Sequence, residues 1–242
     1  MSPADEIQEI YNPQNDSWFQ HTWFRLVRFG FRLLYNEMAW SYDLVSWVVS
    51  LGRWRQWQLA AVPHLQGQRI LEIAHGPGHM LLELGQKGFQ VYGADLSPAM
   101  GRQAARRISR AGLSPLLARS DSRLLPFRSE SFDSLLSTFP AEFIVDPRTI
   151  QEMFRILIPG GRVVIVPEGR LEGEGFLRRL ISWLFIITGQ RFDLEKDGGA
   201  SELWPRIQNR FLEEGFKVAI ERVHLEDSSA TIVILDKPST NN

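Results

Sequence analysis

The chain has 242 residues, 44% hydrophobic and 23% charged, so it can bury a core, and disorder is excluded as the default. It has no cysteine, which excludes disulfides, thiolate nucleophiles and cysteine metal sites. A net charge of −1 gives no general attraction for nucleic acid, and we expect no such partner. No apolar run approaches the roughly 20 residues of a membrane span. The polar start is unlike a signal peptide, so we expect a cytoplasmic protein.

Residues 1–62 are expected to form a helical extension or lid ahead of a domain at 63–242. A helix predicted at 17–35 carries three arginines on one face and an apolar stripe beside them. This pattern suits a helix packed on the domain, which we favour, and it also suits peripheral contact with a membrane surface.

The middle of the chain alternates short apolar runs with helical patterns. We expect strands at 69–74, 90–95, 116–120, 132–139 and 162–167, and helices at 77–87, 97–111, 148–157 and 202–214. Ser97 is the predicted N-cap of the second of these helices. The run 159–161, Pro-Gly-Gly, is expected to stop the third helix before the fifth strand.

Two further strands, at 217–223 and 231–235, follow one another without a helix and must pair antiparallel. The fold class is therefore α/β, a Rossmann-like, doubly wound, seven-stranded sheet with five parallel strands and an antiparallel terminal hairpin. Residues 169–199 are expected as a helical insertion that roofs an acceptor site, because ligands of such sheets lie beyond the carboxyl ends of the strands. Its apolar part, 176–188, would complete the core or touch a membrane edge.

The glycine-rich turn after the first strand predicts a nucleoside site. Glu72 ends the strand, and the turn 74–78 lets backbone approach a ligand because glycine has no Cβ. Asp95 ends the second strand, where a carboxylate can accept both hydroxyls of a ribose. The dinucleotide fingerprint needs glycine where Leu81 stands, which counts against NAD and FAD.

A third acid follows the third strand. Asp121 can accept from an adenine amino group, while the apolar residues of 124–127 would sandwich the base. An ordinary loop acid is the alternative. Two histidines, His75 and His79, flank the glycine turn and could orient a ligand or act as a base, although a turn histidine is more often incidental.

Together these residues resemble the class I S-adenosylmethionine-dependent methyltransferases over residues 69–168. That family's first motif, E/D-x-G-x-G-x-G, stands here at 72–78, with Ala74 in place of the first glycine. The extra methyl narrows the turn. The family's G-D-A-x-x-L-P-F segment matches 120–127, its L-K-P-G-G turn matches 157–161, and the terminal hairpin fits its antiparallel seventh strand.

Residues 42–57 are similar to the opening segment of the ubiquinone/menaquinone-biosynthesis methyltransferases, where it folds over the cofactor and helps shape the acceptor pocket. By this resemblance Tyr42 is a lid residue near the sulfonium; a packing helix is the alternative. The resemblance implies S-adenosyl-L-methionine as cofactor and S-adenosyl-L-homocysteine as product. It implies methyl transfer by in-line displacement to a small, apolar or aromatic acceptor that is lipid-, quinone- or polyketide-like.

The expected cofactor-binding residues are Tyr42, Glu72, Ala74, His75, Gly76, Gly78, Asp95, Leu96, Met100, Asp121, Ser122, Ser137 and Phe139. Methyl transfer depends on alignment more than on a fixed base, so no catalytic residue is assigned. The candidates are Tyr42, His79 and Glu142. We expect no metal, because the chain has no cysteine and only five histidines along its 242 residues. A non-catalytic, cofactor-binding or membrane-associated scaffold is the alternative function.

Overall fold

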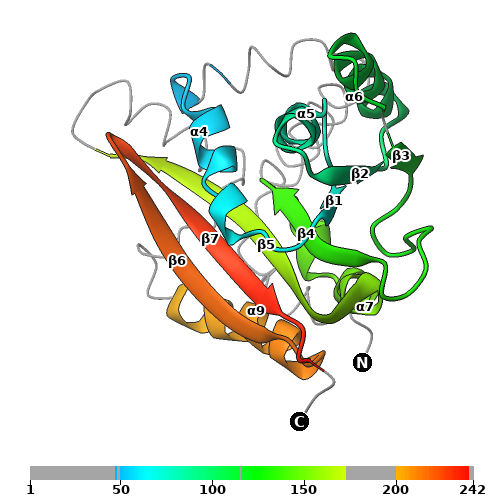
Figure 1. Cartoon of the computed structure of the whole chain (residues 1–242). Helices are drawn as coiled ribbons and strands as arrows, with labels where there is room; N and C mark the ends of the chain where they lie inside the picture. Colours follow the sequence, from blue (N-terminus) through cyan, green and yellow to red (C-terminus); the bar gives the residue numbers. More distant parts are fainter. Residues whose placement is uncertain (1–46, 48–49, 115, 173–199, 240–242) are drawn as a thin grey trace, which may run out of the picture.

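The computed structural model describes residues 47, 50–114, 116–172 and 200–239. Its centre is a seven-stranded sheet with the strand order β3-β2-β1-β4-β5-β7-β6 (Figure 1). The strands are β1 (Arg69–Ile73), β2 (Gln90–Asp95), β3 (Leu116–Arg119), β4 (Phe132–Thr138), β5 (Leu157–Leu171), β6 (Lys217–Leu225) and β7 (Ser228–Asp236). The first five are parallel, and β7 pairs antiparallel with β5 and β6. The predicted fold class is confirmed.

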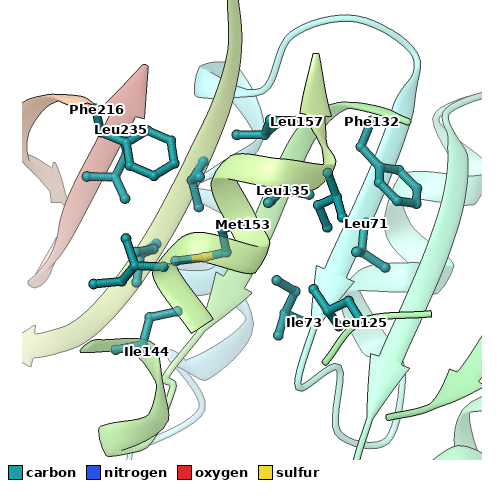
Figure 2. Close-up of a cluster of buried hydrophobic side chains, with 14 of the residues drawn as sticks. Leu71, Ile73, Leu125, Phe132, Leu135, Ile144, Met153, Leu157, Phe216 and Leu235 are labelled. Carbon is teal, nitrogen blue, oxygen red and sulfur yellow. The ribbon is translucent and has the colours of Figure 1, made fainter. Parts of the chain in front are cut away.

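Helices cover both faces of the sheet. In the described ranges they are α4 (Trp54–Leu59), α5 (His79–Gln86), α6 (Pro98–Arg110), α7 (Pro147–Ile156) and α9 (Ala200–Glu213), with short 3-10 helices η3 (Val62–His64) and η4 (Glu142–Val145). On one face, side chains of α4 and α5 pack against the central strands. On the other face, Met153 of α7 lies among Leu71, Ile73 and Leu135 (Figure 2). Parallel strands covered on both sides read as continuous apolar runs, which made them predictable.

Helix caps place the starts of two helices as their sequences require. Ser97 Oγ accepts from the backbone N–H of Met100 at 3.3 Å, which confirms the predicted N-cap of α6. Asp146 caps α7 in the same way, accepting from the N–H of Arg148 at 2.9 Å. Proline occupies the first turn of both helices, where its missing N–H costs nothing.

The bounds of β5 differ from the prediction. The strand starts at Leu157, directly after α7, and includes the Pro-Gly-Gly run that was expected as a turn. An irregular register with β4, between Phe132 and Ser134, accommodates that run. At its far end β5 continues to Leu171, which pairs with Ser228 of β7. Residues 169–171, predicted as insertion, are therefore sheet.

The predicted helix at 17–35 and residues 173–199 of the insertion lie outside the described residues. Within the described ranges, no helix is long and apolar enough to cross a membrane. The domain boundary at 62/63 stays a prediction; η3 spans it.

Candidate functional site

The turn after β1 and the acid at the tip of β2 lie together, as predicted. The backbone N–H of Ala74 donates to the carbonyl of Ala94 at 2.7 Å, which joins the two strand ends. The N–H of Gly76 donates to Asp95 Oδ2 at 2.9 Å. Because β1 sits between β2 and β4, where the strand order reverses, this is the edge at which such sheets bind ligands.

Asp95 also fixes the start of α6. Its Oδ1 accepts from the backbone N–H of Ser97 at 2.8 Å, while Oδ2 holds Gly76. A carboxylate oxygen can accept two hydrogen bonds, so each oxygen keeps the capacity to accept one more from a ligand. The side chain is partly exposed. Asp95 is thus preorganised by backbone donors and still able to bind hydroxyl groups.

The two glycines of the turn serve different purposes. Gly76 has a φ of +54°, and a Cβ built there would meet nothing within 4 Å, so this part of the turn faces open space. At Gly78, with a φ of +81°, a Cβ would lie 2.6 Å from that of Ala104 on α6. Gly76 therefore leaves room for a ligand, and Gly78 allows α5 to pack closely on α6.

Glu72 lies behind the turn. The residue is only 1% exposed, and its carboxyl accepts from the backbone N–H of Leu81 in the first turn of α5. Its Oε2 has no hydrogen-bond partner among the described residues. Burial, followed by the charge of Asp95, raises the pKa of this carboxyl well above its ordinary value. In this structure Glu72 is buried, so its carboxyl offers no exposed surface for the predicted contact with a cofactor.

His75 is buried beneath the same turn. Its ring Nδ1 lies 2.7 Å from the carbonyl oxygen of Gly76, and a Cβ on Gly93 would lie 2.7 Å from its Cδ2. Burial lowers the pKa of the imidazole, although the charge of Asp95 opposes this. A neutral His75 that donates to Gly76 stabilises the turn from within. His79, the first residue of α5, is partly exposed.

The end of β4 carries a cluster of aromatic rings formed by Trp54, Trp57 and Phe139. Trp54 stacks on Phe139 with ring centroids 3.9 Å apart, and Trp57 lies 6.2 Å from Phe139. Gln58 of α4 donates to Thr138 Oγ1 at 2.9 Å and so ties α4 to the tip of β4. The sequence placed Phe139 at this edge and predicted that the segment 42–57 folds over the cofactor, but it did not single out Trp54 within that segment or Gln58 directly after it. The spacing of Trp54 and Trp57, which puts both on one helix face, was the available signal.

Three predicted cofactor-binding residues already form polar contacts within the protein: Ser137, Asp121 and Ser122. Ser137 is buried and donates to the carbonyl of Ile73 at 3.0 Å. Both oxygens of Asp121 accept from Arg123, at 2.6 and 3.0 Å, and this guanidinium lowers the pKa of Asp121. Ser122 Oγ lies 3.0 Å from Thr149 Oγ1. A ligand would have to share these groups.

The expected sandwich for a base is wrong at Phe127. That ring packs edge-on against Phe132, the first residue of β4, with centroids 5.0 Å apart. It therefore lies toward the amino-terminal ends of the parallel strands, away from the candidate site, because the chain after β3 must return to the start of β4. Leu125 is also buried, at 3% exposure, whereas Leu124 is 77% exposed and free to contact a ligand.

The remaining predicted residues are less closely joined to the turn. Leu96 is 62% exposed directly after Asp95, while Met100 on α6 is fully buried and offers a ligand no open surface. Glu142 is exposed at the start of η4, and Tyr42 lies outside the described residues. Their contacts with a cofactor or an acceptor stay predictions. In the described part of the chain, no group of acidic residues and histidines is arranged to hold a metal.

Comparison with known proteins identifies the family. The sequence model of a protein family described as "Methyltransferase domain" matches residues 71–165. The ubiquinone/menaquinone biosynthesis C-methyltransferase UbiE of Geobacter sulfurreducens is 31% identical over 183 residues, which cover 68% of each chain. The chain belongs to the UbiE-like family of methyltransferases. The family is that of the class I S-adenosylmethionine-dependent enzymes, and its methyl donor is S-adenosylmethionine.

Other relatives match over shorter spans. The demethylmenaquinone methyltransferase of Clavibacter sepedonicus is 34% identical over 137 residues, which are 54% of this chain and 55% of that protein. The chain therefore spans little more than half of this relative. Among solved structures, Haemonchus contortus phosphoethanolamine N-methyltransferase 2, in complex with phosphomonomethylethanolamine and S-adenosylhomocysteine, has a TM-score of 0.55. It is 19% identical, and the match covers 78% of this chain and 53% of that one, so this likeness shows the fold alone.

The site fits the family's cofactor on this structure's own geometry. The space at Gly76, where a Cβ would touch nothing, is on the same turn that Asp95 holds. A nucleoside at this edge would find a carboxylate for its ribose and uncovered backbone beside it. The methyltransferase departs from the family motif at Ala74, which takes a φ of +56° where the motif has glycine. The substitution thus keeps the turn's backbone shape, at the expense of strain in an L-residue.

Proposed function

We propose that this chain transfers a methyl group from S-adenosylmethionine to a small apolar acceptor with a quinone-like ring. The observation that carries the proposal is the joined pair of Gly76 and Asp95, with an N–H to Oδ2 distance of 2.9 Å beside open space. Two relatives are named for demethylmenaquinone and for ubiquinone/menaquinone biosynthesis, which supports an acceptor of this class.

The residues of this chain would act by placement. S-adenosylmethionine supplies a methyl group on a sulfonium, and correct alignment of the acceptor can lower the barrier by about 7–11 kcal/mol. Asp95 would hold the ribose through charge-assisted hydrogen bonds worth about 1.5–3 kcal/mol each. Tyr42, His79 and Glu142 are the candidates for a base, which the reaction needs only where the acceptor must lose a proton.

The aromatic cluster supports a planar acceptor. Trp54 and Phe139 form a stacked pair at the tip of β4, the strand next to β1 at this edge of the sheet. Aromatic rings prefer offset stacking or edge contacts with other rings, which gives an aromatic acceptor more contact than a linear one. Phe139 has a φ of +52°, an uncommon backbone conformation for a bulky side chain. Such outliers cluster at functional sites.

Calorimetry with S-adenosylhomocysteine tests the cofactor half of the proposal. We expect the wild-type chain to bind and Asp95→Asn to weaken the affinity about 10- to 150-fold, the factor that corresponds to one charged hydrogen bond. Asp236→Asn is the matched control, because Asp236 lies at the end of β7 and pairs with Arg162 at 2.6 Å. Unchanged affinity in Asp95→Asn would remove the ribose assignment, and no wild-type binding at high micromolar concentration would reject the proposal.

Turnover tests the acceptor half. Labelled S-adenosylmethionine is incubated with the protein and a prenylated naphthoquinol that lacks its ring methyl group, and the organic extract is counted. Transfer above the level of a no-enzyme control is expected. Cofactor binding without transfer to this acceptor, or to any component of a bacterial extract, would favour the non-catalytic alternative.

A further inference from the structure

One edge of the molecule carries a row of arginines that the cofactor site does not use. Arg102, Arg106 and Arg110, here called the arginine row, follow one another at intervals of four residues on α6, and all three are exposed. Residues 96–120 hold five arginines and no acidic residue, in a chain with a net charge of −1. The row is therefore a local basic surface on a chain that lacks overall positive charge.

The orientation of the row is fixed by the opposite face of α6. Met100, Ala104 and Ile108 are buried, and the last two pack with Leu81 of α5. Positions on the other side of the helix must then face outward. α6 and β3, the edge strand of the sheet, lie side by side at the margin of the molecule (Figure 1). Arg119 of β3 is exposed as well, which extends the basic surface beyond the helix.

The arginine row makes no polar side-chain contact within the part of the chain that the structure describes. Among the described residues, none of the three forms an ion pair or a side-chain hydrogen bond. Other arginines of the region differ: Arg107 donates to the carbonyl of Pro77 in the cofactor turn, and Arg123 pairs with Asp121. Three adjacent like charges on one helix face repel each other and cost some stability. Such a surface suits an anionic partner that neutralises it.

We infer that the arginine row docks the protein on the anionic headgroups of a phospholipid bilayer. Each basic residue near such a surface strengthens binding about fivefold, and an exposed helix face can lie along a flat membrane. α6 begins three residues after Asp95, so docking would place the cofactor site beside the bilayer. The docked protein would then meet an apolar acceptor dissolved in the bilayer; in this respect the inference rests on the proposed function.

A bilayer suits this surface better than a nucleic acid does. Residues 96–120 contain no aromatic side chain on which bases could stack, and single-stranded sites usually combine a basic groove with such rings. The row also lies on the outer face of a helix rather than in a groove. An RNA hairpin is therefore the competing partner to be tested beside the vesicles.

Vesicle cosedimentation tests the inference. The full chain is mixed with vesicles of phosphatidylcholine and phosphatidylglycerol in equal parts, and with vesicles of phosphatidylcholine alone. We expect binding only to the anionic vesicles, reduced at high salt because the attraction is screened. The variant Arg102→Gln, Arg106→Gln, Arg110→Gln should lose on the order of 100-fold in partitioning, since three factors of about five are removed.

A matched variant separates position from total charge. Arg128→Gln, Arg148→Gln, Lys217→Gln removes the same charge from other exposed sites and should bind anionic vesicles like the wild type. Equal binding of the arginine-row variant and the wild type overturns the inference. So does a wild type that ignores anionic vesicles, or arginine-dependent binding to an RNA hairpin without binding to vesicles.

Failure of this inference is distinguishable from failure of the proposed function. Calorimetry with S-adenosylhomocysteine on the arginine-row variant should give the wild-type affinity, because these residues lie outside the cofactor turn. Loss of vesicle binding with intact cofactor binding supports the docking role. A wild type that binds vesicles but not S-adenosylhomocysteine would remove the proposed function and leave the docking surface standing.

Discussion

Ala74 shows how a single residue can retain a turn that another residue type would make more easily. Its φ of +56° lies in the left-handed region, where an L-residue is less stable than glycine by about 1–2 kcal/mol. Glycine also increases the entropy of the unfolded chain, which offsets part of this gain. We therefore expect Ala74→Gly to raise the free energy of unfolding by up to about 1 kcal/mol. Urea unfolding measures this change.

The control for Ala74 is its hydrogen-bonded neighbour. Ala94, in β2, is 2% exposed, and its carbonyl accepts from the N–H of Ala74. Ala94→Gly should lower the free energy of unfolding by about 1–2 kcal/mol, since it loses a buried methyl group and adds backbone freedom. If Ala74→Gly is destabilising to a similar degree, the strain assigned to this turn does not exist.

At the same scale, the sequence predicted some site residues better than others. Asp95 and Gly76 could be predicted to meet because neighbouring parallel strands end at one edge of a sheet. The burial of Glu72 could not, because it depends on where the first turn of α5 sits above β1. Phe127 was misplaced for a similar reason: its local sequence does not say where the loop from β3 to β4 turns back across the sheet edge.

At the scale of elements, α4 is held on the sheet by an indole that lies against a glycine. A Cβ on Gly169 of β5 would lie 2.1 Å from the ring of Trp57, which is 2% exposed. Gly169→Ala should therefore displace Trp57 and lower the free energy of unfolding by about 1–3 kcal/mol, the usual cost of overpacking. Thermal and urea unfolding would detect the change.

Gly101 provides the matched control. It lies within α6, and a Cβ built there meets nothing within 4 Å. Gly101→Ala should raise the free energy of unfolding by about 0.5–1 kcal/mol, because alanine is the better helix former. Equal effects of the two substitutions, in either direction, would contradict the close contact between Gly169 and Trp57.

At this scale, local sequence signals predicted most of the strands but not the full length of β5, the strand that carries Gly169. The parallel strands and the terminal hairpin are visible as apolar runs between glycine turns, so their order and directions followed from local signals. The length of β5 was not visible, because the part from Glu168 to Leu171 exists through pairing with β7, about 60 residues later. The Pro-Gly-Gly run likewise reads as a turn unless the irregular register with β4 is known.

At the scale of the whole molecule, two buried ionisable side chains make stability depend on pH in opposite directions. Burial raises the pKa of Glu72 above its ordinary 4.5, so the folded state prefers the neutral acid. Stability from this group is present below pH 4.5 and is lost as the pH rises through the folded pKa. Burial lowers the pKa of His75 from 6.5, so His75 destabilises the folded state as the pH falls below that value.

Glu72→Gln isolates the first of these effects. Glutamine can keep the hydrogen bond from the N–H of Leu81 and cannot ionise, so its stability should not fall with rising pH at this site. The difference in the free energy of unfolding, variant minus wild type, should therefore increase from pH 4.5 upward. The difference for His75→Gln should instead increase as the pH falls below 6.5. Urea unfolding across this range measures both, and a flat difference for Glu72→Gln would mean that Glu72 is ionised in the folded protein at no cost. That result would place its carboxylate in contact with solvent or a cation, and would return it to the set of residues that can bind the ribose directly.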